Sequence, residues 1–256
     1  MLFKRVLEAA RMTGSFKLGN MATFALVFLV VGLLGFNQFQ IMTVDASLGS
    51  VLKLQGGSGS GGGSKTLDSA KAELAALDVS GFGSTAQTLV GVFPELKTAE
   101  TEDEILELLI PTGTPEYSEA LGGITFDDPT TSLSFLAKIQ KTWDADLKAA
   151  DPAKYERYIN MASKPMGLSC EFCCGVGAAG VTATGQSKCG CAHHPAILGI
   201  ALGLLKETDY SDGEILREAM KWKTLFFPQK MITLALQSAG KDASEIEVLP
   251  QQVGGC

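Results

Sequence analysis

The stretch Ser169–Leu205 reads SCEFCCGVGAAGVTATGQSKCGCAHHPAILGIALGLL. It holds five of the six cysteines of this 256-residue chain and both of its histidines. These seven residues are Cys170, Cys173, Cys174, Cys189, Cys191, His193 and His194. Soft ligands gathered within so short a segment indicate a metal site, a disulfide framework or a redox centre.

The spacing of the cysteines favours a metal. Cys170 and Cys173 form C-x-x-C, and Cys189 and Cys191 form C-x-C. A glycine-rich stretch between the two pairs can fold back and bring them together. Two close pairs of soft donors suit a tetrahedral Zn²⁺, while thiolates also bind Cu(I) or an iron–sulfur cluster. We therefore expect these four cysteines to share one ion.

Three further residues could join the predicted site. Cys174 is a thiol more than a four-ligand centre needs, and His193 and His194 directly follow the second pair. Each histidine could instead serve only at the start of a helix, so its role as a ligand stays open.

Two alternatives to a metal also stay open. Disulfides would run across the loop, for example from Cys170 to Cys189, because the vicinal pair Cys173–Cys174 is poorly placed to close on itself. Cys170 and Cys173 could also be the thiols of a thiol–disulfide oxidoreductase. No thioredoxin-like βαβ pattern surrounds them, which disfavours this interpretation.

The end of the quoted stretch predicts a buried helix. Pro195 suits the first helical position, and the ten residues Ala196–Leu205 are apolar on every side. Ten residues are too few to cross a bilayer, so this helix is expected in the core. Gly199 and Gly203 lie four apart and leave one face free for close packing by a neighbour.

The N-terminal region predicts a membrane anchor. A basic segment, residues 1–20, precedes residues 21–42, which carry no charge and are long enough to span a bilayer. The positive-inside rule places the N-terminus in the cytoplasm and the body outside. A cleaved signal peptide is the alternative. Residues 43–64 include a Gly/Ser linker, and residues 65–256 form the predicted extracytoplasmic domain.

The predicted domain is mostly α-helical, with few or no strands. Two capping boxes, at Thr101 and Ser211, precede apolar stripes of helical period, and prolines end several of these stripes. Asp127 and Asp128 are expected to cap a helix, with Ca²⁺ binding as the alternative. The expected helices are residues 65–77, 102–110, 132–149, 152–163, 195–205, 212–227 and 229–238.

The charge distribution argues against nucleic acid as a partner. Residues 1–64 carry five basic and two acidic residues, so residues 65–256 hold 16 of the 21 basic and 26 of the 28 acidic residues. Nucleic-acid phosphates would repel so acidic a body. The chain also has no phosphate-binding loop, no H-E-x-x-H motif and no Ser-His-Asp grouping. These patterns favour a binding protein over an enzyme.

Two motifs carry a resemblance to a known group. K-P-x-G-x-S-C-E-x-C-C-G at Lys164–Gly175 and C-G-C-A-H-H-P-A at Cys189–Ala196 resemble uncharacterised archaeal membrane-tethered Cys-rich proteins. The resemblance covers mainly residues 111–256 and implies no activity and no catalytic residue. The sequence as a whole predicts a membrane-anchored, extracytoplasmic metal-binding protein whose site is structural or handles metal. A disulfide-stapled interaction domain is the alternative.

Overall fold

The computed structural model describes residues 67–241 and 252–253, which belong to one compact unit. The described residues form helices and one isolated antiparallel bridge, between Val181 and Ser187, and no strand. The prediction of a mostly α-helical domain is therefore confirmed. The helices are α3 (Leu67–Ala75), α4 (Thr85–Val92), the 3₁₀ helix η1 (Pro94–Lys97), α5 (Glu102–Leu109), α6 (Pro129–Ala150), α7 (Pro152–Ala162), α8 (Glu171–Cys174), α9 (His193–Glu207), α10 (Asp212–Phe226) and α11 (Pro228–Ser238).

Local sequence signals set the ends of several helices. Both predicted capping boxes are present, at Thr101 before α5 and at Ser211 before α10. Asp128 caps α6 by accepting a hydrogen bond from the Thr131 backbone N–H at 3.0 Å. Asp127 accepts one from the Gly113 N–H at 2.7 Å. The aspartate pair is thus explained by backbone hydrogen bonds, and α6 begins at Pro129, three residues earlier than expected.

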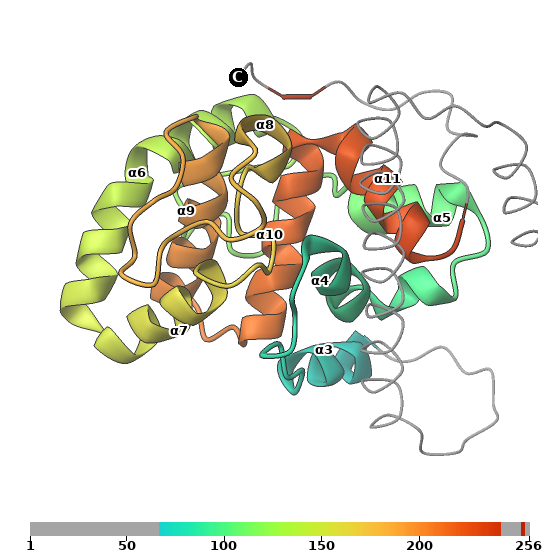
Figure 1. Ribbon diagram of the computed structural model, residues 1–256, viewed down its shortest axis with the longest axis horizontal. Helices are drawn as coiled ribbons and strands as arrows, with labels where there is room; N and C mark the ends of the chain where they lie inside the picture. The colour runs from blue at the N-terminus through green and yellow to red at the C-terminus, as the bar shows by residue number, and fades with distance from the viewer. Residues whose placement is uncertain (1–66, 242–251, 254–256) are drawn as a thin grey trace, which may run out of the picture. The chain divides into compact units, whose positions relative to one another are not determined.

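Helix α9 forms the centre of the core, as its apolar sequence predicted. Residues 196–205 are all buried, and α9 packs against α6, α7 and α10 (Figure 1). A Cβ at Gly199 would lie 3.0 Å from the Leu136 carbonyl oxygen, so the glycine permits close approach of α6. The helix begins at His193 rather than at Pro195, which places both histidines in its first turn.

Helix α10 connects the core to the remaining helices. It packs against α9 on one side and against α3, α4, α5 and α11 on others (Figure 1). Its last turn carries Lys223, whose side chain reaches Glu171 in α8. The cysteine-bearing segment is therefore held where the start of α9 meets the end of α10.

The predicted membrane anchor, residues 21–42, lies outside the described residues, as do the basic segment 1–20 and the linker 43–64. Within residues 67–241 and 252–253, no helix has both the length and the hydropathy required to cross a bilayer. The anchor and its topology stay predictions.

Candidate metal centre

The loop between α8 and α9 folds back as the glycine-rich sequence predicted. Gly175 ends α8 in the left-handed conformation, with φ 66°. The chain then returns to α7, where the N–H groups of Gly180 and Val181 both donate to the Ala162 carbonyl, at 2.8 and 3.1 Å. A tight turn closed by the Val181–Ser187 bridge follows. This path brings the second pair of cysteines back beside α8.

Four thiols meet at the end of this loop. Their sulfurs all lie within 4.8 Å of one another. All four are free thiols: Cys170, Cys174, Cys189 and Cys191. The disulfide framework weighed from the sequence is therefore not formed at these positions, and the cross-loop bridge Cys170–Cys189 is not present. Four thiolates that converge on one position are suitable ligands for Zn²⁺ and other soft transition metals.

The distances between the sulfurs test whether one ion fits. In a tetrahedral centre with Zn–S bonds of about 2.3 Å, two sulfurs lie about 3.8 Å apart. Cys170 Sγ and Cys191 Sγ lie 3.4 Å apart, close to that spacing. Cys174 Sγ and Cys189 Sγ lie only 2.6 Å apart. One of these two side chains would have to move by about 1 Å to complete a tetrahedron.

The buried side of the cluster is fixed by hydrogen bonds. Cys170 is fully buried, and its Sγ and backbone N each lie 3.4 Å from His194 Nδ1. His194 Nε2 donates to the Gly180 carbonyl oxygen at 2.7 Å, which leaves Nδ1 as the acceptor in a neutral ring. Burial lowers the pKa of His194 and so favours this neutral form. His194 therefore orients Cys170. It is not itself one of the residues that converge on the candidate metal position.

The exposed side of the cluster is held by the two sulfurs themselves. Cys174 is exposed and Cys189 is half-buried. Hydrogen bonding to Cys189, and then burial, raises the pKa of Cys174 to about 11. Burial acts to raise the pKa of Cys189, but hydrogen bonding with Cys174 and from the Cys191 N–H outweighs it and lowers that pKa to about 7. The lower pKa makes Cys189 the more readily ionised of the two thiols, and so the more nucleophilic.

Cys173 and His193 lie beside this cluster. Both fall within 4.8 Å of Cys191 and of each other in a second group of possible ligands. Cys173 is not one of the four converging thiols. His193 is buried, its ring lies 4.7 Å from that of Phe227, and its Nε2 lies 2.5 Å from the Val253 carbonyl oxygen. The structure thus brings three of the four expected ligands together, with Cys174 where Cys173 was expected.

Sequence reasoning missed Lys223 and the close packing at Gly180, both of which support the cluster. A Cβ at Gly180 would lie 1.9 Å from the Leu168 carbonyl oxygen, a distance no side chain tolerates. Lys223 is fully buried and contacts Glu171, next to Cys170. A signal for Lys223 existed, since it lies four residues after Ala219 on the apolar stripe of α10. A lysine on such a stripe is a reason to search for its partner.

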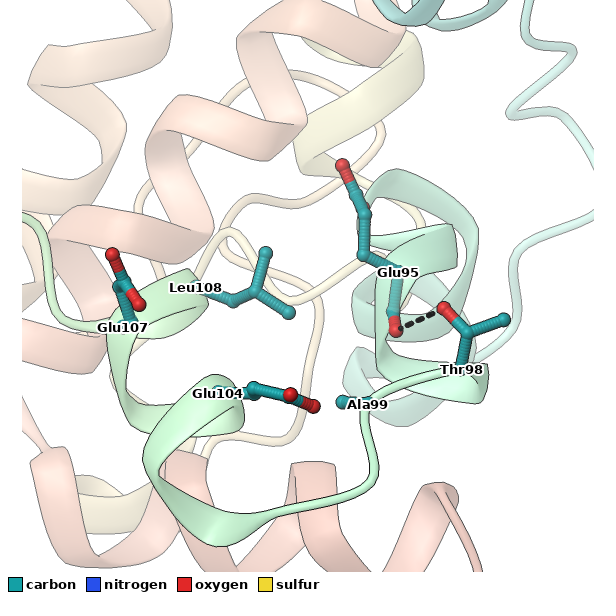
Figure 2. Close-up of a pocket in the computed structure, with 6 residues that line it drawn as sticks. All are labelled: Glu95, Thr98, Ala99, Glu104, Glu107 and Leu108. Atoms are coloured by element: carbon teal, nitrogen blue, oxygen red, sulfur yellow. Dashed lines mark hydrogen bonds between the residues drawn. The ribbon is translucent and has the colours of Figure 1, made fainter. Parts of the chain in front are cut away.

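A surface pocket of about 380 Å³ lies in a separate place, between η1 and α5 (Figure 2). Three glutamates line it, but Glu95 pairs with Arg217 at 3.0 Å and Glu104 caps α5. Two of the three acidic groups are therefore explained by the fold, and the thiol cluster remains the candidate site.

No protein-family model, no curated protein and no solved structure matches this chain. The candidate site therefore rests on the geometry of its own residues, and the resemblance to archaeal Cys-rich proteins stays a prediction.

Proposed function

We propose that this protein binds one soft transition metal ion, with Zn²⁺ as the expected occupant, through Cys170, Cys174, Cys189 and Cys191. The observation that carries the proposal is the convergence of four free thiols from the two ends of one glycine-rich loop. Such a centre would fasten α8 and its loop to the start of α9. Metal binding would then contribute to folding, because an unfolded chain offers no preformed site.

The exposure of Cys174 favours metal handling over a purely structural role. Four protein thiolates would close the coordination sphere as in a structural zinc site, but this cluster is buried at Cys170 and exposed to solvent at Cys174. An open edge gives a competing ligand access to the ion. We expect a chelator to remove the metal within minutes rather than days.

The test is elemental analysis of the purified full chain, with a count of free thiols before and after chelation. About one equivalent of zinc per chain is expected, with the clustered thiols becoming reactive only after the metal is removed. Protein purified under reducing conditions that holds no metal and takes up no added Zn²⁺ or Co²⁺ would refute the proposal.

A thiol–disulfide oxidoreductase is the second candidate, favoured by the 2.6 Å contact between Cys174 Sγ and Cys189 Sγ. The structure moves this hypothesis away from Cys170, which is buried. Cys189 would attack a substrate disulfide and release one thiol, and Cys174 would then displace the second thiol and leave a Cys174–Cys189 disulfide. Reduction of a model disulfide by the metal-free chain, lost in Cys189→Ser, would support this activity.

We also propose that the domain is carried outside the cell on the predicted anchor, residues 21–42. The uncharged stretch and the basic segment before it support this topology. A tag at the C-terminus should then be recognised by antibody on intact cells. Recognition only after the cells are permeabilised would contradict it.

A further inference from the structure

Lys223 is a charged residue in a buried position, and this burial needs a physical explanation. Among the residues that the structure describes, it is the only Lys, Arg, Asp or Glu that is buried, and its exposed fraction is 0%. Moving an ammonium out of water costs several kcal/mol unless opposite charge and hydrogen bonds compensate. The groups around its Nζ therefore indicate why a positive charge lies there.

Those groups all belong to the segment around Cys170. Lys223 Nζ donates to the Gly167 carbonyl oxygen at 2.8 Å and to Glu171 Oε1 at 2.6 Å. It also lies 4.9 Å from the centroid of the Phe172 ring. Glu171 Oε1 accepts a second hydrogen bond, from the Thr85 hydroxyl of α4. The ammonium of Lys223 is thus bound to the segment 167–172, which carries the buried thiol of Cys170.

The charge of a filled metal centre makes this position significant. Four thiolates around a divalent ion leave a net charge of −2, and Glu171 adds another negative charge beside Cys170. In a partly buried site such charge is unfavourable without a positive group nearby. Burial lowers the pKa of Lys223, whereas the charge of Glu171 and the hydrogen bond to it act to raise it. Lys223 Nζ is bound to Glu171, the residue that directly follows Cys170, which brings its positive charge near the metal centre.

We propose that Lys223 is the buried counter-charge of the thiolate–metal centre. Its ammonium stabilises the deprotonated, metal-bound state of Cys170 and its neighbours, in addition to holding the segment 167–172 in place. The inference rests on the proposed metal-binding function and deepens it, because it assigns part of the metal affinity to a residue that does not touch the ion.

Two substitutions separate a counter-charge from a structural clamp. Lys223→Met removes the positive charge. Glu171→Gln removes the neighbouring negative charge but keeps an oxygen that can accept from Lys223 and Thr85. A counter-charge predicts opposite effects, with weaker metal binding in Lys223→Met and tighter binding in Glu171→Gln. A clamp predicts weaker binding in both, because each substitution weakens the same contact.

The control is Lys221→Met, which makes the same change two residues away in α10. Lys221 Nζ pairs with Glu218 at 2.6 Å. Its removal should leave metal affinity within about twofold of that of the unmodified chain, because its partner Glu218 lies on α10 and not on the cysteine-bearing segment. This variant separates the position of Lys223 from a general loss of positive charge.

The measurement is titration of the full chain with Co²⁺, followed by competition with Zn²⁺. The visible bands of tetrahedral Co²⁺ report the ligand geometry separately from the affinity. We expect dissociation constants about tenfold higher for Lys223→Met and about threefold lower for Glu171→Gln, with the bands of both unchanged. If Glu171→Gln binds no tighter than the unmodified chain, the counter-charge assignment is overturned.

Failure of this inference is distinct from failure of the proposed function. If the unmodified chain binds neither Co²⁺ nor Zn²⁺, the metal-binding function itself is refuted. If it binds and both variants are weaker, only the counter-charge role is refuted. Should Lys223→Met fail to fold, the sign of the change in Glu171→Gln still decides.

Discussion

The two sides of the thiol cluster differ in what holds their sulfurs. On the buried side, Cys170 is fixed by His194, which is itself fixed by the Gly180 carbonyl oxygen. On the exposed side, the sulfurs of Cys174 and Cys189 contact each other, and Cys189 Sγ also accepts from the Cys191 N–H at 3.5 Å. The packed core therefore sets the position of Cys170 Sγ, whereas local contacts near the surface set the positions of Cys174 Sγ and Cys189 Sγ.

This difference indicates how the site would work. A ligand placed by the fold costs no reorganisation when the ion binds, so Cys170 provides a preorganised half-site. Cys174 and Cys189 lie on the solvent side, so they can adjust by the roughly 1 Å that tetrahedral coordination needs, or can leave the ion again. Changes on the buried side should therefore alter folding and binding together, and changes on the exposed side should alter metal binding and thiol reactivity with little effect on folding.

The largest effect is expected at Gly180, which supports the buried side. In Gly180→Ala, a Cβ would lie 1.9 Å from the Leu168 carbonyl oxygen, so the backbone of the loop has to move. We expect the free energy of unfolding to fall by about 3 kcal/mol, measured by urea unfolding of the metal-free chain. Gly190→Ala is the control, because its Cβ meets nothing within 4 Å. Equal loss in both variants would show that the close approach at Gly180 does not matter.

The next effect is expected at Cys170. Cys170→Ala removes the preorganised ligand and leaves His194 Nδ1 buried without its sulfur neighbour. We expect metal content to fall close to zero and the metal-free chain to lose about 2 kcal/mol of stability. Elemental analysis and urea unfolding of the full chain measure the two quantities.

Cys174→Ala is the comparison for Cys170→Ala. It removes an exposed ligand whose place water can take, so the metal should bind more weakly but still bind. If the two alanine variants lose metal and stability to the same extent, the contrast between the buried and exposed sides is wrong.

A smaller effect should appear in the pH dependence of stability. Burial lowers the pKa of His194 below its ordinary value of 6.5, so the fold favours the neutral ring. This contribution is fully present above about pH 6.5 and is lost as the pH falls further, because the unfolded chain then binds the proton more readily. Between pH 7.5 and 5.5, the metal-free chain should therefore lose about 1 kcal/mol more than His194→Gln. If the free energy of unfolding changes with pH to the same extent in the two proteins, this prediction is wrong.

The helices could be predicted because their signals are local. The capping boxes at Thr101 and Ser211 and the apolar run of α9 each lie within one short segment, and all three formed as expected. The start of α9 was placed two residues late because Pro195 suits the first helical position. The structure instead has it in the first turn, after both histidines.

The membership of the cluster could be predicted only in part. The two cysteine pairs indicated convergence, but the choice between Cys173 and Cys174 depends on how α8, a helix of a single turn, faces the returning loop. The contact between Lys223 and Glu171 joins residues 52 positions apart, so no local pattern reveals it. Orientation and long-range pairing are properties of the packed structure, and spacing along the chain does not encode them.

The smallest effect on stability, and the most specific chemical one, is expected on the exposed side. Hydrogen bonding with Cys174 is the main factor that lowers the pKa of Cys189 to about 7. In Cys174→Ala this contact is lost, so the pKa of Cys189 should rise and less of it should be thiolate at pH 7. Alkylation of Cys189 by iodoacetamide in the metal-free chain should slow by about fivefold or more, followed by mass spectrometry of the peptide. Stability should change by less than about 0.5 kcal/mol, because an exposed side chain is removed. Alkylation at an unchanged rate would show that Cys174 does not lower the pKa of Cys189. The proposed difference in reactivity between the exposed and buried sides would then be wrong.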